Sequence, residues 1–298
     1  MIKKIISSLI KPRVLQRLWK KFLFLFYIEQ WSLLVARGSA ETVPSWENFN
    51  LLTPPKDRFW ADPFPWHVNG EDYIFYEELP YSTKKGYISC MKLGRDFEIL
   101  SNEVVLDRPY HLSYPFLFEY KGHLYMLPET RQNRTIEIYR CEHFPNKWEK
   151  AGALIDNIEA VDATLLEFNG KWWLFTNVVK PGGNAYDSLY LYYSDSPISD
   201  KWIPHPLNPV LRDIKYARPA GRIFKRDEYL IRPSQDCTAR YGYAINFNRI
   251  DQLSETDYKE TPLTHFTPPK DNLKILSTHT WNKSGSLHTI DAEYWRRR

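Results

Sequence analysis

Two aspartates stand where the chain is expected to begin an apolar strand. Asp62 opens the run Asp-Pro-Phe-Pro-Trp, and Asp162 opens the run Asp-Ala-Thr-Leu-Leu. Aspartate is among the poorest strand-forming residues, and burial of its carboxylate without partners costs free energy. Each aspartate could instead cap a local turn. Two such openings nevertheless favour a functional site, in which carboxylates would act in acid–base, nucleophilic or electrostatic catalysis.

Other polar side chains follow the same pattern and are predicted to surround these aspartates. Tyr114, Arg218 and His288 are assigned to the matching first-strand position of other segments, and His111 lies just ahead of Tyr114. The ends of the following strands carry a second polar layer. Its candidate site members are Glu129, Arg131, Arg232 and Asp236, whereas Glu77, Glu78 and Gln235 are interpreted as a structural ion-pair network. Asp62, Asp162 and Glu129 are the catalytic candidates, and the others are candidates for binding substrate.

Three arginines, Arg218, Arg222 and Arg232, are expected to surround the start of one strand. The guanidinium fork matches the geometry of phosphate and carboxylate groups. These arginines could therefore bind a phosphate or an acidic ligand. They could also form salt bridges to the aspartates across the same channel, and the sequence leaves both alternatives open.

A repeat of about fifty residues positions these side chains. Similar segments begin at residues 62, 114, 162 and 219, and each is predicted to form a strand, a tight turn and a second strand. The predicted turns are Asn69-Gly70, Lys121-Gly122, Asn169-Gly170 and Arg226-Asp227. Asn-Gly between apolar runs is a strong hairpin signal, because both turn residues need a positive φ. The second strands are apolar and aromatic, which is typical of strands buried on both faces.

Further strands complete each repeat. Third strands are expected at 86–93, 135–144, 188–195 and 241–250, and weaker fourth strands at 97–106, 148–155 and 202–210. Four antiparallel strands per unit make one blade of a β-propeller. A fifth blade is expected from residues 283–291, completed by an early strand at 30–36, which would close the ring and remove open edges. The predicted fold is therefore an all-β, five-bladed propeller, and a β-sandwich is disfavoured by the regular repeat.

Composition narrows the class of protein. The 298 residues carry a net charge of +4, but seven basic residues and no acidic ones lie in residues 1–21, and three arginines end the chain. Removing those ten leaves 30 basic residues against 36 acidic ones, which argues against a nucleic-acid-binding platform. Three widely spaced cysteines offer neither a disulfide framework nor zinc-ligand spacing, so a reducing, cytoplasmic location and no metal or cofactor are expected.

Residues 1–29 are predicted to form a basic amphipathic segment with a short helix, ahead of a propeller domain at 30–298. Its longest apolar run, 22–28, is too short to cross a bilayer, and no small-residue cleavage site follows. Residues 1–28 could lie on the inner face of an anionic membrane. Alternatively, this segment could dock on the propeller or on another protein.

The openings of blades one, three and four resemble those of the furanosidase superfamily of five-bladed propellers, which includes arabinanases, invertases and levansucrases. This resemblance implies that Asp62 is a base or nucleophile and that Asp162 stabilises an oxocarbenium-like transition state. The runs HLSYPF, PET, VDAT, RPAGR and QDC…RYGYAI more closely resemble the N-terminal propeller region of plant glucosamine inositolphosphorylceramide transferases. Bacterial relatives of that region occur in surface-polysaccharide synthesis.

Blade four departs from the furanosidase pattern, because Arg218-Pro-Ala-Gly-Arg222 stands where those hydrolases place a glutamate acid. A glycoside hydrolase needs an acid for its leaving group, whereas a phosphate leaving group needs positive charge. We therefore expect a glycosyltransferase that uses a nucleotide sugar as donor and a glycan or glycolipid as acceptor. The alternatives are a furanosidase-type hydrolase, with Glu129 or Asp236 as a displaced acid, and a non-catalytic glycan-binding propeller.

Overall fold

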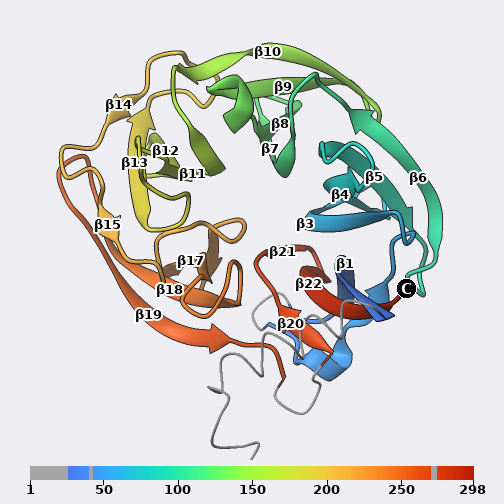
Figure 1. Ribbon diagram of the computed structural model, residues 1–298. Helices are drawn as coiled ribbons and strands as arrows, with labels where there is room; N and C mark the ends of the chain where they lie inside the picture. Colours follow the sequence, from blue (N-terminus) through green and yellow to red (C-terminus); the bar gives the residue numbers. More distant parts are fainter. Residues whose placement is uncertain (1–25, 40–42, 270–273) are drawn as a thin grey trace, which may run out of the picture.

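The computed structural model describes residues 26–39, 43–269 and 274–298, and the regular secondary structure of this part of the chain is almost entirely β-strand. Five sheets stand around one central axis, in sequence order around the ring (Figure 1). The predicted five-bladed β-propeller is therefore confirmed. Most of the basic helical segment predicted at 1–29 lies outside the described residues. Its residues 27–29 belong to the first described strand, β1 (Tyr27–Arg37), so the propeller begins three residues earlier than predicted.

Blades one and two are regular four-stranded antiparallel sheets. Blade one consists of β3 (Arg58–Val68), β4 (Glu71–Pro80), β5 (Tyr87–Leu93) and β6 (Ile99–Leu106). Blade two consists of β7 (Ser113–Tyr120), β8 (His123–Glu129), β9 (Thr135–His143) and β10 (Lys147–Asp156). A short 3-10 turn, η2 (Arg131–Asn133), joins β8 to β9.

Blades three and four follow the same plan with weaker edges. Blade three consists of β11 (Ala160–Phe168), β12 (Lys171–Val178) and β13 (Ser188–Ser194), with two-residue edge strands β14 (Ile203–Pro204) and β15 (Leu211–Arg212). Blade four consists of β16 (Phe224–Arg226), β17 (Tyr229–Asp236), β18 (Ala244–Leu253) and β19 (Tyr258–Phe266). The fourth strand predicted at 202–210 is interrupted, because its prolines cannot donate to a β-ladder.

Blade five joins the two ends of the chain, as predicted. It consists of β21 (Trp281–Ser284), β22 (Leu287–Arg297), β1 (Tyr27–Arg37) and β2 (Asn50–Leu52), with β20 (Ile275–Ser277) beside β22 and the 3-10 turn η1 (Trp46–Asn48) before β2. β1 pairs with β22 along its whole length, from Tyr27 opposite Arg297 to Arg37 opposite Leu287. The prediction that His288 opens this blade was wrong, because His288 lies on the second strand.

The core lies between the blades. Three consecutive residues of β4, Ile74, Phe75 and Tyr76, have no exposed surface, which confirms that the second strand is buried on both faces. Phe75 packs edge-on against Trp148 of the next blade, at 5.7 Å between ring centroids. Aromatic side chains thus fill the wedge between neighbouring sheets, where their large area is removed from water.

The first strands of blades one, two and three share an unusual backbone. Asp62, Tyr114 and Asp162 adopt left-handed conformations, with φ of 52°, 45° and 53°. At each of them the ladder to the second strand shifts register, as at a β-bulge. Left-handed non-glycine residues cost of order 1–3 kcal/mol and gather at functional sites, and a bulge changes where a side chain points. The same position, counted back from the hairpin turn, is occupied by Ala220 in blade four and by Thr278 in blade five. The prediction that Arg218 opens blade four was therefore wrong by two residues.

Candidate active site

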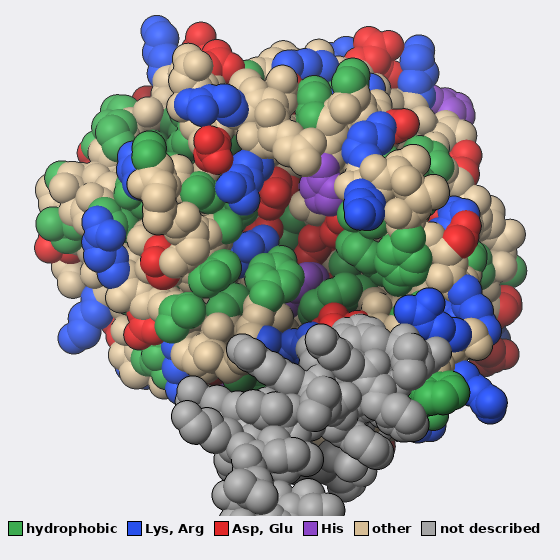
Figure 2. Space-filling model, viewed as in Figure 1, with side chains coloured by type: hydrophobic (Ala, Val, Ile, Leu, Met, Phe, Trp, Pro, Cys, Tyr) green, Lys and Arg blue, Asp and Glu red, His purple; other side chains and the backbone are tan. Residues whose placement is uncertain are grey.

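A pocket of about 210 Å³ lies on the axis, where the first strands begin and the second strands end. In Figure 2 the ring is hollowed at its centre, and acidic, basic and histidine side chains gather there. The polar side chains that line the pocket are Asp62, Glu77, His111, Ser113, Glu129, Arg218 and His279. The volume is below the about 300–1,000 Å³ of pockets for drug-sized ligands, so it suits a single small ring.

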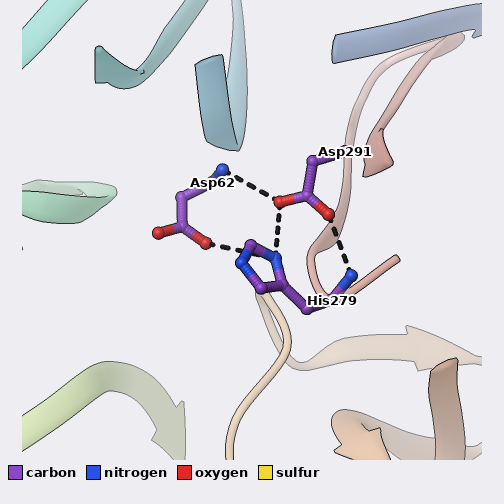
Figure 3. A group of neighbouring side chains, drawn as sticks. All are labelled: Asp62, His279 and Asp291. Atoms are coloured by element: carbon purple, nitrogen blue, oxygen red, sulfur yellow. Dashed lines mark hydrogen bonds and ion pairs between the residues drawn. The ribbon is translucent and has the colours of Figure 1, made fainter. Parts of the chain in front are cut away.

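Asp62 is held by three hydrogen bonds at the start of β3. Its Oδ1 accepts from the hydroxyl of Thr280 at 2.6 Å, and its Oδ2 accepts from the backbone N–H of Tyr114 at 3.3 Å. Its own backbone N–H donates to Oδ2 of Asp291 at 3.0 Å (Figure 3). These contacts come from blades two and five, so Asp62 is fixed by the blades on either side of blade one.

The pocket also changes the acidity of Asp62. Burial raises its pKa, and repulsion from the carboxylates of Asp162 and Asp291 adds to this effect, whereas attraction by His279 opposes it. The resulting pKa is about 6. Asp62 is therefore ionised at neutral pH and takes up a proton in mildly acidic solution.

His279, in the loop before β21, forms a dyad with Asp291 of β22. Its Nδ1 lies 2.6 Å from Oδ2 of Asp291 and 3.7 Å from Oδ1 of Asp62, and its ring stacks on Trp31 with 4.1 Å between centroids (Figure 3). Burial alone would lower the pKa of His279, but the two carboxylates raise it to about 9. The ring is therefore a cation beside Asp62 at neutral pH.

Asp62, His279 and Asp291 are also the described residues whose spacing could suit a metal ion, with one ligand atom each within 4.8 Å of the others. The Asp291 carboxylate, however, already accepts from the backbone N–H groups of Asp62, His279 and Thr280 and contacts the imidazole. An ion would have to replace the His279–Asp291 contact. The geometry is that of a histidine–aspartate ion pair that fixes Asp62.

Asp162 is 1% exposed and bound by Arg218 in a fork. Arg218 Nε lies 2.5 Å from Oδ2, Nη2 lies 3.2 Å from Oδ1, and the amide of Gln235 donates to Oδ2 at 3.0 Å. The guanidinium also lies over the ring of Tyr241, 5.0 Å from its centroid. Arg218 thus neutralises Asp162, which is one of the two alternatives that the sequence left open.

Two glutamates complete the acidic wall from the ends of β4 and β8. Desolvation and repulsion from Asp162 raise the pKa of Glu129 to about 8, against the attraction of Arg218. Desolvation also raises the pKa of Glu77 well above its ordinary value. Both carboxyl groups are therefore inclined to hold a proton at neutral pH. Glu77, interpreted as structural from the sequence, lines the pocket.

His111 is a neutral neighbour of Glu77. Its Nδ1 accepts from the backbone N–H of Gly86 at 2.9 Å, which leaves the ring proton on Nε2, 3.3 Å from Oε1 of Glu77. Burial lowers the pKa of His111. Gly86 is required here, because a Cβ on it would lie 2.6 Å from the carbonyl oxygen of Leu112 and 2.8 Å from Oε1 of Glu77.

Tyr114 forms a bridge across the axis. It belongs to blade two, yet its hydroxyl contacts Oγ1 of Thr164 in blade three at 2.8 Å and accepts from the N–H of Gly221 in blade four at 2.8 Å. Phe64 of blade one packs edge-on against its ring. The Tyr114 side chain therefore links blades one to four at the axis.

The remaining predicted residues lie outside the pocket. Arg222 donates to the backbone carbonyl of Leu117 and lies over Phe116, deeper along the axis than the opening of β7. The other residues of this group have partners of their own: Arg232 with Glu260, Asp236 with Thr238 and His265, and His288 with the carbonyl of Ser39. Arg131 lies in a second groove beside Glu129.

Three side chains that the sequence did not reveal also line the pocket. His279 and Trp31 belong to blade five, and Tyr241 lies in the loop between β17 and β18 of blade four. Asp291 supports His279 from behind. The sequence signal for His279 is the polar run Ser-Thr-His-Thr at 277–280, which precedes the hairpin at 283–291 and so falls in no expected element.

Together these groups can do acid–base chemistry. When the surroundings of two buried carboxyl groups give them different pKa values, one can be ionised while the other is protonated at the same pH. Asp62, at about 6, and Glu129, at about 8, form such a pair. Asp162 adds negative charge nearby, balanced by Arg218.

Residues 51–295 match the family described as "Glucosamine inositolphosphorylceramide transferase 1, N-terminal". The chain belongs to this family. Over 245 residues it is 35% identical to glucosamine inositolphosphorylceramide transferase 1 of Oryza sativa subsp. japonica, which covers 79% of this chain and 31% of the rice protein. The Arabidopsis thaliana protein of the same name is 34% identical over 208 residues, or 68% of this chain and 27% of its own length.

The chain thus spans about a third of the length of the curated relatives that it matches. Membership of the glucosamine inositolphosphorylceramide transferase N-terminal family confirms the resemblance inferred from HLSYPF, VDAT and RPAGR. The family name describes relatives named as transferases, and the region shared with them is this propeller.

Solved structures show the same fold at low identity. Zg3597, a family 117 glycoside hydrolase from Zobellia galactanivorans, is 14% identical with a TM-score of 0.55, and 90% of each chain is covered. The β-1,2-mannobiose phosphorylase of Listeria innocua is 12% identical with a TM-score of 0.54, and covers 86% of this chain and 96% of its own. At such identity these likenesses establish the shared propeller fold alone.

Proposed function

We propose that the axial pocket binds one sugar unit and promotes transfer of its glycosyl group, with Glu129 as general acid and Asp62 as base or nucleophile. The observation that carries this proposal is the pair of pocket carboxyls with separated acidities, about 6 for the pKa of Asp62 and about 8 for that of Glu129. In glycoside hydrolysis one carboxyl of each kind flanks the anomeric carbon, and we propose the same division of roles here. A positioned acid or base contributes about 10²–10⁴-fold in rate.

Asp162 has a separate role in this proposal. The transition state of glycosyl transfer carries positive charge on the sugar ring, and a fixed carboxylate stabilises such charge without reorganisation. Asp162 is held rigid by Arg218 and Gln235, so it cannot turn away as charge develops. Trp31 and Tyr241 line the same pocket and offer aromatic faces to the apolar face of a sugar.

A phosphate-activated sugar, such as a nucleotide sugar, is the donor that we propose, and a glycan or glycolipid is the acceptor. The relatives carry the name glucosamine inositolphosphorylceramide transferase, and inositolphosphorylceramide is a lipid that contains a phosphodiester. Glu129 can protonate or hydrogen-bond the leaving phosphate oxygen from the pocket wall. Arg218 and Arg222 were expected from the sequence to bind the phosphate. They have no such role in this proposal, because Arg218 binds Asp162 and Arg222 lies deeper along the axis.

The setting that we propose is surface-polysaccharide synthesis at the inner face of a bacterial membrane. Cys90, Cys141 and Cys237 are all free thiols, as suits a reducing compartment. Of the described residues, none belongs to a helix with the length and hydropathy needed to span a bilayer. Fractionation of cells that express the tagged chain tests this setting, since recovery in the soluble fraction at low salt would contradict membrane association.

A panel of nucleotide sugars tests the activity. We expect one donor to raise the melting temperature and, with glycan or glycolipid acceptors, to give a product of increased mass. The Glu129→Gln variant should keep the melting shift and lose most turnover, whereas Glu119→Gln, an exposed change on the same blade, should behave as the parent. A chain that binds no donor and forms no product would contradict the proposal.

The pH profile gives a second test. Because Asp62 must be ionised and Glu129 protonated, kcat/KM should fall below about pH 6 and above about pH 8. These limits belong to the pair and not to either residue alone. Glu129→Gln should lose the alkaline limb while the acidic limb remains.

Glycoside hydrolysis is the second candidate, and Glu129 is the specific observation that favours it. The acid missing from blade four is available from blade two, so the absence of a blade-four glutamate no longer argues against a hydrolase. Release of nitrophenol from aryl glycosides, lost in Asp62→Asn, would establish hydrolysis. If the pocket binds sugars without turnover of either substrate class, the propeller is a binding module.

A further inference from the structure

A second groove of about 580 Å³ adjoins the axial pocket, and the two share His111 and Glu129 in their walls. The side chains that line only the groove are Arg131, Gln132, Arg134 and Glu159. A ligand that occupies both hollows must therefore pass Glu129, the proposed acid. With Glu129 as the acid of the proposed transfer, the leaving group of a bound sugar would extend past it into the groove.

The segment that carries the two arginines is firmly built. Thr130 is 1% exposed, and its hydroxyl donates to the carbonyl of Thr135 at 2.6 Å. The side-chain oxygen of Gln132 accepts from the N–H of His111 at 2.9 Å, which ties η2 to the pocket wall. Arg134 adopts a left-handed conformation with φ of 56°, and its carbonyl accepts from the N–H of Ile158 at 3.0 Å.

The charges of the groove are unbalanced. Arg131 and Arg134 both approach a single carboxylate, that of Glu159, at 3.4 and 3.3 Å. Charge-assisted hydrogen bonds between guanidinium and carboxylate are normally about 2.7–2.9 Å, so neither contact is tight. Each guanidinium has five donors, and their side chains are 39% and 61% exposed. Two cations that share one anion leave a positive surplus at the groove.

The other arginines predicted for the site differ in this respect. Arg218 is bound in a fork by Asp162, and Arg232 is 1% exposed and bound in a fork by Glu260. Both are saturated by carboxylates. Arg131 and Arg134 present loosely held donors toward a hollow that opens on the reacting groups, and the guanidinium fork suits phosphate oxygens.

We propose that this groove is a phosphate subsite, in which Arg131 and Arg134 bind the phosphate of a substrate whose sugar occupies the axial pocket. The assignment rests on the proposed glycosyl transfer. The phosphate can come from two sources, the diphosphate of a nucleotide-sugar donor or the phosphodiester of a lipid acceptor. In both cases the anion replaces the long contacts to Glu159 with shorter, bidentate ones.

Calorimetric titration of the full chain at low ionic strength tests the subsite. The two probes are uridine diphosphate and glycerophosphoinositol, and the variant is Arg131→Gln/Arg134→Gln. The control is Arg95→Gln/Arg212→Gln, which removes the same charge from exposed positions elsewhere. We expect the groove variant to weaken at least one probe by tenfold or more and the control by less than twofold. Tighter binding of uridine diphosphate assigns the donor side, and tighter binding of glycerophosphoinositol assigns the acceptor side.

Equal affinities in the groove variant and the control would overturn the subsite, as would a parent chain that binds neither probe. Binding needs no turnover, so this result is separate from the fate of the proposed activity. If turnover occurs but the groove variant binds as the control does, only the subsite fails.

Discussion

The wall of the axial pocket has two unlike halves. Blades one to three supply the acids. Asp62 comes from a left-handed first-strand position, and Glu77 and Glu129 come from the ends of second strands. Asp162, at another left-handed position, is buried behind this wall and bound to Arg218. Blades four and five, with β1, supply cations and aromatic rings: Arg218, His279, Tyr241 and Trp31. The acidic half carries backbone strain at its first-strand positions, whereas the matching positions of the other half are Ala220 and Thr278.

The contrast shows how a repeated fold acquires a single polar site. A bulge in the same place on three blades turns Asp62, Tyr114 and Asp162 toward the axis, and the two aspartates would repel the glutamates and each other. Ion pairs between neighbouring blades relieve this repulsion. Asp162 is paired by Arg218, and Asp62 lies beside His279, so each strained residue of the acidic half has a partner from the other half. Asp62 and Glu129 keep raised pKa values because burial disfavours their charged forms and this compensation is incomplete.

The largest expected effect comes from removal of a charge in the acidic half. Asp62→Asn keeps the shape of the side chain and removes the base or nucleophile, so turnover should fall by about 10²–10⁴-fold. Steady-state rates with the donor found in the nucleotide-sugar panel measure this loss. Asp200→Asn, an exposed change, is the control. Turnover within threefold of the parent would show that Asp62 is structural.

The next effect tests the pairing between the halves. Arg218→Met leaves Asp162 with Gln235 as its remaining side-chain partner, and removal of one member of a buried ion pair costs about 3–5 kcal/mol. Urea denaturation should show a loss of this size. The double variant Asp162→Asn/Arg218→Met should recover much of it, because no charge is then left unpaired. A double variant as unstable as Arg218→Met would mean that packing, and not charge, dominates.

The pH dependence of stability tests the cation of blade five. The folded pKa of His279 is about 9 and its ordinary value is 6.5, so the protonated ring stabilises the fold fully below pH 6.5. This contribution is lost as the pH rises through 9. At about 1.4 kcal/mol per pKa unit, it is up to about 3 kcal/mol. Urea denaturation from pH 6 to 10 should show the fall.

Glu129 also makes the free energy of unfolding fall as the pH rises, because its raised pKa favours the folded state at low pH. His279→Gln should therefore reduce the fall between pH 6.5 and 9 without abolishing it. His143→Gln, an exposed change, should leave it as in the parent. A fall of the same size in both variants would mean that the His279–Asp291 pair does not hold the proton.

The sequence predicted the acidic half of this comparison better than the other half. Asp62 and Asp162 were visible because a carboxylate violates the apolar pattern of a strand at a regular spacing. The hairpin turns were visible because Asn-Gly marks a positive φ, and Asn69 and Asn169 both have φ of 52°. The spacing of the repeat and the turn preference of Asn-Gly depend only on residues that are near one another in the chain. A single sequence is therefore enough to reveal them.

The cationic half depends on contacts that no local pattern contains. Arg218 and Arg222 are four residues apart and chemically alike, yet one meets Asp162 and the other meets the carbonyl of Leu117. His279 becomes a site residue because ring closure brings β22 and β1 beside β3. The acidity of Glu129 follows from its surroundings, which come from several blades. These contacts and this pKa can be known only once the five blades are packed into a closed ring.

The smallest expected effect concerns the contact between neutral His111 and Glu77, which lies beside Gly86 in the acidic half. Gly86→Ala would place a Cβ 2.6 Å from the backbone oxygen of Leu112 and 2.7 Å from the ring of His111, so the loop must shift. Overpacking of this kind costs about 1–3 kcal/mol, and it should also release the contact between His111 and Glu77. Urea denaturation gives the cost, and an imidazole pKa nearer 6.5, measured by NMR, would report the release. Gly183→Ala, in a surface turn with more room, is the control. If Gly86→Ala is as stable as that control and His111 titrates as in the parent, the acidic half does not depend on the close packing at this glycine.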